Sequence, residues 1–205
     1  MESELGWGTT GNIGRMSKQY TVAQPACGHH RDADQGSGIE HDVFHYFAYG
    51  SCMCPVDLKR SLGEHMHPYV IGGAVLRGYR LGFFRRSRLR NCGVLDIVRD
   101  TSASVHGVLY RLPMRLSDRL DAREEGYCHE TISVEYGTHV ISNVRTYTVI
   151  DKASQEHAPN DWYFTVVMRG AVTCRLPEQY CWKLFHHMQR LQDQHRESRT
   201  FKTAS

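Results

Sequence analysis

Hydrophobic and polar residues alternate along several segments of the chain, as they do in half-buried β-strands. Strands are expected at about residues 43–49, 68–84, 92–98, 104–112, 128–137 and 144–150. Turn-forming residues separate them, among them Gly63, Arg99-Asp100 and Gly137-Thr138. The pattern predicts a mostly antiparallel sheet.

Two other segments have helical periodicity. Leucines recur at every fourth position from 112 to 120, which predicts a short helix from Pro113 to Glu125 that Gly126 ends. Apolar residues at spacings of three and four predict an amphipathic helix over 177–192. A further helix is expected to begin near Pro55, directly after the first strand.

The chain is expected to have one folded domain with an extension at each end. Residues 1–40 are rich in Gly, Ser, Asp, Gln and His and have no sustained period, so they are predicted to form a flexible N-terminal extension. The folded domain is predicted over 41–195, and 196–205 is predicted to be a polar C-terminal tail that frays. A length of 205 residues with 40% hydrophobic content suits a single core.

Composition argues against several classes of protein. No run of 18 apolar residues is present, and the N-terminus has no basic segment followed by an apolar stretch, so neither a membrane span nor a secretory leader is expected. A formal net charge of +3 does not by itself indicate a nucleic-acid partner. Seven cysteines without a C-x-x-C pair favour reduced thiols and a cytoplasmic location. The oligomeric state stays open, with a homodimer as one option.

The first strand ends in a loop that could hold an anion. Tyr49 is followed by Gly50, Ser51, Cys52 and Met53, and the next helix directs its positive end towards this turn. Backbone N–H groups released from the strand ladder can donate to a carboxylate or an oxyanion there. The alternative is an ordinary turn between a strand and a helix.

A pair of acidic residues marks the end of the helix predicted after Pro113. Glu124 and Glu125 lie at its C-terminus, where the helix dipole disfavours a further negative charge. A partly buried carboxylate at that position is expected to have a raised pKa, as a general base that later returns its proton requires. The alternative is a solvated acidic helix end beside Arg123.

Together these two segments resemble the gamma-glutamylcyclotransferase family. That family has a Tyr-Gly-Ser-Asn type of loop after its first strand and a Leu-Asp-x-x-Glu-Gly type of segment before a later strand. Further resemblances follow in the family's order between Phe44 and Leu191, at Val75–Leu81, Gly93–Leu95, Val105–Tyr110, Thr131–Tyr136, Arg145–Val149, Pro159–Tyr163 and Met168–Ala171. Their order and spacing make the resemblance specific.

The resemblance implies an α+β fold, a small mixed and mostly antiparallel β-barrel with a few flanking helices. It also implies an enzyme that releases 5-oxoproline and an amine from a small gamma-glutamyl compound, without a metal or another cofactor. Glu124 would be the general base and acid. The substrate would be bound by Tyr49, Gly50, Ser51, Cys52, Met53, Tyr127 and Tyr163, with Tyr127 and Tyr163 orienting Glu124 and the substrate.

The sequence departs from the family at two points. Cys52 stands where the family has Asn, so an amide contact is replaced by a weak S–H donor. The sequence has two neighbouring glutamates where the family has one. Counting from the Leu-Asp pair selects Glu124, and counting back from Gly126 selects Glu125; the better match of the preceding segment favours Glu124. The identity of the leaving amine stays open.

Other functions are compatible with parts of the sequence. The same barrel could bind an acidic small molecule or a partner's glutamyl side chain without catalysis. Cys52 could be a nucleophile near a helix N-terminus, although an inert buried thiol is favoured because no base stands at a defined spacing. The arginines of 85–90 could bind nucleic acid, but a solvated hairpin loop at the rim of the pocket is favoured. No ligand spacing supports a metal site.

Overall fold

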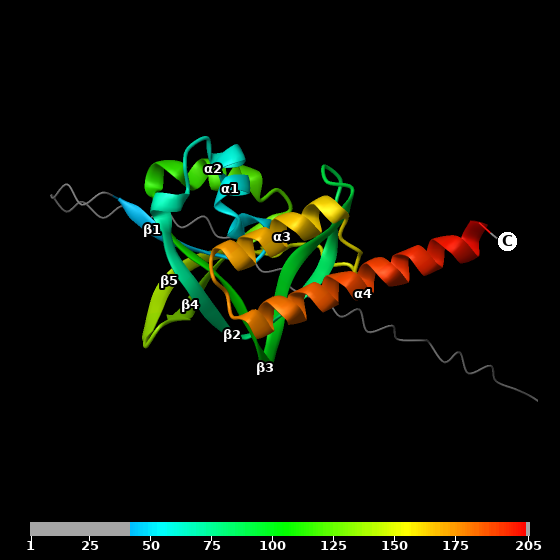
Figure 1. Cartoon of the computed structure of the whole chain (residues 1–205). Helices are drawn as coiled ribbons and strands as arrows, with labels where there is room; N and C mark the ends of the chain where they lie inside the picture. Colours follow the sequence, from blue (N-terminus) through cyan, green and yellow to red (C-terminus); the bar gives the residue numbers. More distant parts are fainter. Residues whose placement is uncertain (1–41, 204–205) are drawn as a thin grey trace, which may run out of the picture. The chain divides into compact units, whose positions relative to one another are not determined.

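The strands of the computed structural model, which describes residues 42–203, close into a five-stranded barrel (Figure 1). They are β1 (Val43–Ala48), β2 (Val70–Ser87), β3 (Cys92–Pro113), β4 (Tyr127–Tyr136) and β5 (His139–Val149). Around the barrel their order is β1-β3-β2-β4-β5. β1 and β5 pair in parallel, and the other pairs are antiparallel. The predicted α+β fold with a mixed, mostly antiparallel barrel is confirmed.

The C-terminal half of β1 is buried on both faces. Tyr46 is 3% exposed, and Phe47 and Ala48 are fully buried. A strand that is covered on both sides has no polar face, and for this reason the sequence shows an aromatic run there. The ladder between β1 and β3 ends at the pair Ala48 and Val108, so the loop that follows begins inside the core.

The turn predicted at Arg99-Asp100 is wrong, because β3 continues through it and the two strands predicted on either side are one. β3 pairs with β2 before and after this point, but the register shifts opposite Gly78, where residues 100–103 have no partner in β2. Asp100 accepts hydrogen bonds from the backbone N–H and the hydroxyl of Ser102, at 3.1 and 2.7 Å. These local contacts are those of a turn, and they account for the turn-like sequence inside a strand.

Helices and 3-10 turns flank the barrel. They are η1 (Ser51–Met53), α1 (Pro55–Leu62), η2 (His67–Tyr69), η3 (Met114–Leu116), α2 (Ser117–Arg123), α3 (Asp161–Thr173) and α4 (Glu178–Thr203). The helices predicted near Pro55 and after Pro113 are confirmed. The last helix is longer than the predicted 177–192, because α4 continues through most of the segment expected to fray as a tail.

Helix α3 holds the loop after β1 in place. Asn160 caps this helix and accepts a hydrogen bond from the backbone N–H of Tyr163 at 2.8 Å. Its residue Gly170 faces η1 so closely that a Cβ there would lie 2.6 Å from the backbone nitrogen of Cys54 and 2.7 Å from the carbonyl carbon of Met53. Glycine is therefore required at 170 for the helix and the loop to pack.

The predicted extension over residues 1–40 lies outside the described residues, as do the last two residues of the predicted tail. Every helix in the described part of the chain is too short or too polar to cross a bilayer.

Candidate active site

The loop between β1 and α1 presents backbone donors rather than acceptors. The hydroxyl of Tyr110 on β3 donates to the carbonyl oxygens of Cys52 and Met53, at 3.0 and 3.1 Å. These carbonyls are thereby directed towards the barrel core. Within residues 42–203 the backbone N–H groups of Gly50, Ser51 and Cys52 donate to no protein acceptor. The loop has the donor arrangement expected of an anion or oxyanion pocket.

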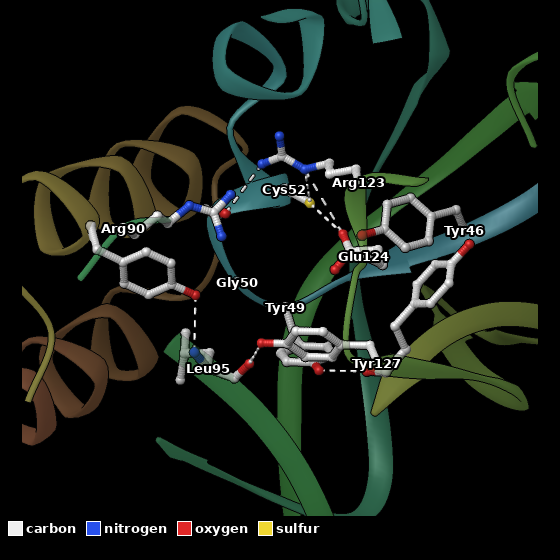
Figure 2. Close-up of a pocket in the computed structure, with 12 residues that line it drawn as sticks. Tyr46, Tyr49, Gly50, Cys52, Arg90, Leu95, Arg123, Glu124 and Tyr127 are labelled. Atoms are coloured by element: carbon white, nitrogen blue, oxygen red, sulfur yellow. Dashed lines mark hydrogen bonds and ion pairs between the residues drawn. The ribbon is translucent and has the colours of Figure 1, made fainter. Parts of the chain in front are cut away.

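Glu124 faces this loop from the end of α2, as Figure 2 shows. The thiol of Cys52 donates to its Oε1 at 3.1 Å, and Arg123 Nε lies 3.9 Å from the same oxygen. The side chain of Glu124 is 14% exposed. Burial raises the pKa of Glu124 above its ordinary value, although the positive charge of Arg123 and the Cys52 hydrogen bond oppose the shift. The direction is the one predicted for a general base.

Arg123 is the hub that joins the loop, the helix α1 and Glu124. Its Nη2 lies 2.6 Å from Asp57 Oδ2 and 3.3 Å from Ser51 Oγ, and its Nε lies 3.0 Å from Cys52 Sγ. Both Arg123 and Asp57 have side chains that are 7% exposed, so this ion pair is buried. Since Asp57 neutralises part of the guanidinium charge, Arg123 can lie beside Glu124 without abolishing its raised pKa.

Cys52 is a buried thiol that serves as a weak hydrogen-bond donor. Its burial raises its pKa to about 11, and the negative charge of Glu124 acts in the same direction against the opposing effect of Arg123. A thiol with this pKa is protonated at neutral pH and is a poor nucleophile. This favours the predicted non-nucleophilic role.

Among residues 42–203, no group of three or more His, Cys, Asp or Glu side chains could hold a metal ion.

The two tyrosines predicted to orient Glu124 hold the backbone of Leu95 on β3 instead. Leu95 N–H donates to the hydroxyl of Tyr163 at 3.0 Å, and the hydroxyl of Tyr127 donates to Leu95 O at 2.9 Å. Neither tyrosine hydrogen-bonds to Glu124. Since the Tyr163 oxygen accepts from Leu95, its own proton is available to a ligand in the pocket.

The pocket at this site is small, with a cavity volume of about 30 Å³. Seven of the eight residues chosen from the sequence line it: Tyr49, Gly50, Ser51, Cys52, Glu124, Tyr127 and Tyr163. Met53 does not, because its side chain is fully buried beneath α3. Glu125 is exposed and lies outside this pocket.

Sequence reasoning missed several residues that complete the pocket: Tyr46, Arg90, Leu95, Arg123 and Tyr147. Arg90 comes from the β2–β3 hairpin, whose arginines were predicted to lie at a pocket rim, and its side chain points across the cavity towards Glu124 in Figure 2. Tyr147 accepts a hydrogen bond from Tyr49 Oη through its backbone oxygen at 2.5 Å. The aromatic run of β1 was a sequence signal for Tyr46. The other missed residues reach the pocket from distant parts of the chain.

Known proteins resemble this chain in sequence and in structure. Residues 104–184 match the model of the AIG2-like family. The Bacillus subtilis (strain 168) protein named "Putative gamma-glutamylcyclotransferase YkqA" is 29% identical over 183 residues, which are 84% of this chain and 64% of that protein. The chain therefore spans less than two thirds of the length of this relative.

Solved structures share the barrel. The crystal structure of YkqA from Bacillus subtilis has a TM-score of 0.65 and 31% identity, over 72% of this chain and 54% of that one. A gamma-glutamyl cyclotransferase structure has a TM-score of 0.62 at 22% identity, over 70% of this chain and 86% of that one, and shows the fold alone. The chain is thus similar to the AIG2-like family in sequence and to gamma-glutamylcyclotransferases in fold, which confirms the resemblance found in its motifs.

Proposed function

We propose that this protein is a cyclotransferase that converts a gamma-glutamyl compound into 5-oxoproline and a free amine. One observation carries the proposal: a carboxylate with a raised pKa, Glu124, faces a loop whose backbone N–H groups are unpaired within the described residues. A base and an oxyanion site in one pocket are the two elements that attack of an amine on an amide carbonyl requires.

The reaction is an internal acyl transfer. The α-nitrogen of the glutamyl group forms a bond to its own side-chain carbonyl carbon, and the bond from that carbon to the leaving nitrogen breaks. Two protons leave the α-ammonium group in total, and two arrive at the leaving nitrogen, which departs as an ammonium ion. Glu124 would take a proton from the first nitrogen and deliver it to the second, as a base and then as an acid.

The loop residues Gly50, Ser51 and Cys52 would donate their backbone N–H groups to the oxyanion or to the substrate carboxylate. One such donor contributes roughly 3 kcal/mol in other enzymes. Because nucleophile and electrophile belong to one molecule, the main task of the protein is to hold the bent conformation in which they meet. The proposed reaction requires no metal or other cofactor for this reason.

Arg123 and Tyr163 would position the reacting groups. Arg123 donates to the sulfur of Cys52, and the Cys52 thiol donates to Glu124. Tyr163 would direct its free hydroxyl proton into the pocket, because its oxygen already accepts from Leu95. These residues fix the direction of the Glu124 carboxylate and one wall of the substrate site.

A second candidate function is a binding module that holds a gamma-glutamyl group without turnover. Two observations favour it: Cys52 replaces the Asn of the family loop, and the cavity of about 30 Å³ must widen to admit a glutamyl group. The raised pKa of Glu124 favours an enzyme over a binding module, because a carboxylate in the pocket is unfavourable for binding an anion and useful for proton transfer.

A screen of gamma-glutamyl compounds separates the two candidates. Gamma-glutamyl amino acids, gamma-glutamylamines and glutathione would be incubated with the protein, and 5-oxoproline would be measured by mass spectrometry. If the protein is an enzyme, at least one class of gamma-glutamyl compound should yield 5-oxoproline. A binding module predicts a rise in melting temperature with a compound that yields no product, and that result would overturn the proposal.

We further propose that the protein acts in the cytoplasm on a small-molecule substrate. The support comes from composition: seven cysteines without a C-x-x-C pair suit a reducing compartment. Expression of a tagged protein followed by cell fractionation would test the location. Recovery with the membrane or the secreted fraction would contradict it.

A further inference from the structure

A second pocket is also lined by Glu124. It has a cavity volume of about 310 Å³ and is lined by the β2–β3 hairpin residues 85–90 together with Val94, Arg123, Glu124, Glu125 and Tyr127. Four residues line both pockets: Arg90, Arg123, Glu124 and Tyr127. The carboxylate of the proposed acid and base therefore lies where a small pocket meets a tenfold larger one.

The hairpin supplies four arginines to this second pocket, at positions 85, 86, 88 and 90. None of the four makes an ion pair with a carboxylate within residues 42–203. The carboxylates that line the same pocket are Glu124 and Glu125, and Arg123 pairs with Asp57 outside it. The lining thus carries an excess of positive charge.

Neutral contacts hold three of these guanidinium groups in place. Arg86 donates to Asn91 Oδ1 at 2.8 Å. Arg85 lies over the ring of Tyr127 at 5.6 Å and donates to Gly126 O at 3.2 Å. Gly126 has a φ of +79°, and a Cβ there would lie 1.9 Å from Arg85 Nη1, so only glycine permits this contact. Arg90 lies over the ring of Tyr163 at 5.8 Å. Guanidinium groups stacked on rings keep their charge and their donors for a ligand.

The proposed reaction fixes which half of the substrate reaches the second pocket. The glutamyl half must contact the loop of Gly50 and Ser51, in the small pocket. The leaving nitrogen must come within hydrogen-bond reach of Glu124 to receive its proton. The rest of the leaving amine then extends past Glu124 into the larger pocket, among the arginines.

Resting on the proposed function, we infer that the second pocket binds the leaving amine and selects amines that carry a negative charge. A carboxylate or a phosphate on the leaving half would accept hydrogen bonds from these arginines, which make no ion pair within the described residues, as charge-assisted contacts that Arg makes with two parallel N–H groups. Gamma-glutamyl amino acids and peptides fit this pocket better than gamma-glutamyl derivatives of neutral or cationic amines.

Two substrates that differ by one charge test the inference. Gamma-glutamylglycine and gamma-glutamylglycinamide have nearly the same size, and 5-oxoproline release gives kcat/KM for both. The expected preference for the glycine compound is on the order of tenfold or more at low salt, and it falls as salt screens the arginines. Glycinamide is the less basic amine and chemically the better leaving group, so intrinsic reactivity would give the opposite order.

A third substrate distinguishes the two kinds of anion. The gamma-glutamyl derivative of 2-aminoethyl phosphate places a phosphate where the glycine compound has a carboxylate. Whichever of the two has the higher kcat/KM identifies the anion that the pocket accepts. If both were slower than the neutral amide, the inference would be wrong.

Variants locate the preference on the hairpin. Arg86→Gln with Arg88→Gln removes two exposed charges of this pocket, and the ratio of kcat/KM for glycine to glycinamide should fall at least threefold. Arg77→Gln is the matched control, because this exposed arginine pairs with Glu135 away from both pockets, and it should leave the ratio unchanged.

The outcomes separate this inference from the proposed function. Equal kcat/KM for the charged and neutral substrates, or a preference that the double variant does not reduce, would overturn the charge selection while the cyclotransferase stands. Equal rates would also result if the arginines bound the α-carboxylate of the glutamyl half. If no gamma-glutamyl compound released 5-oxoproline, the proposed function itself would fail.

Discussion

The buried ion pair between Asp57 and Arg123 offers a perturbation that reaches both stability and catalysis. Asp57→Asn keeps the size of the side chain and leaves an amide oxygen that can still accept from Arg123, but it removes the counter-charge 2.6 Å from the guanidinium. Both side chains are 7% exposed, so the remaining positive charge stays largely out of water. Arg123 is then expected to turn towards Glu124, which is 3.9 Å away.

The size of the stability loss follows from this geometry. Removing one partner of a buried ion pair costs about 3–5 kcal/mol. Glu124, Ser51 and Ser61 remain as partners of Arg123, so the loss should lie at or below the lower limit of this range, at about 2–3 kcal/mol. For a domain of this size that corresponds to a fall in melting temperature of roughly 4–12 °C.

The same variant should move the pH dependence of turnover. A general base works in its ionised form, so the rate rises with pH through the pKa of Glu124. In the natural protein burial holds that pKa above its ordinary value. When Asp57 is neutral, the full charge of Arg123 acts on Glu124 and lowers its pKa, and the acid limb of the profile shifts to lower pH.

Calorimetry and the pH profile of 5-oxoproline release measure the two effects of Asp57→Asn. Asp151→Asn, at an exposed position outside both pockets, is the control and should change neither. If Asp57→Asn left both the melting temperature and the acid limb unchanged, Arg123 would not be the hub that holds Glu124.

Three further predictions concern Cys52, Gly170 and residues 1–40. Cys52→Ser should retain substantial turnover, because a hydroxyl also donates to Glu124 and the backbone donors remain; loss of turnover, with a glutamyl adduct on the natural protein in mass spectrometry, would indicate covalent catalysis instead. Gly170→Ala should lower stability by about 1–3 kcal/mol in denaturant titrations, since its Cβ would lie 2.6 Å from the backbone of Cys54; an unchanged midpoint would contradict this packing. Deletion of residues 1–40 should leave melting and turnover nearly unchanged, because their composition offers little apolar surface, and a loss of substrate affinity would place the domain boundary earlier.

Local patterns identified much of the site because they also determine which way a side chain faces. Leu120 and Glu124 are four residues apart and so share a helix face. Leu120 is fully buried, which turns Glu124 inwards, whereas Glu125 is exposed. The choice of Glu124 from the Leu-Asp spacing thus agrees with the direction of the side chain. Its catalytic role remains a prediction.

Features that depend on distant parts of the chain could not be predicted in this way. Asp57 and Arg123 are 66 positions apart, and no periodicity links them. The hydrogen bond from Leu95 N–H to the Tyr163 hydroxyl spans 68 positions, so the sequence suggested a contact of Tyr163 with Glu124 instead. The strand β3 appeared interrupted because Asp100 and Ser102 make turn-like contacts, but it pairs with β2 on both sides of this point and is one strand.

The most direct test of the account compares Glu124→Gln with Glu125→Gln in 5-oxoproline release from the best gamma-glutamyl substrate. Glutamine keeps the shape of Glu124 and can still accept from Cys52, so folding and substrate binding should persist. Turnover should fall by a factor on the order of 100 or more for Glu124→Gln, since an amide neither takes nor returns the proton, and should change little for Glu125→Gln. A larger loss of turnover for Glu125→Gln would show that Glu124 is the wrong choice for the proton transfer. Near-normal 5-oxoproline release by both variants would contradict the mechanism.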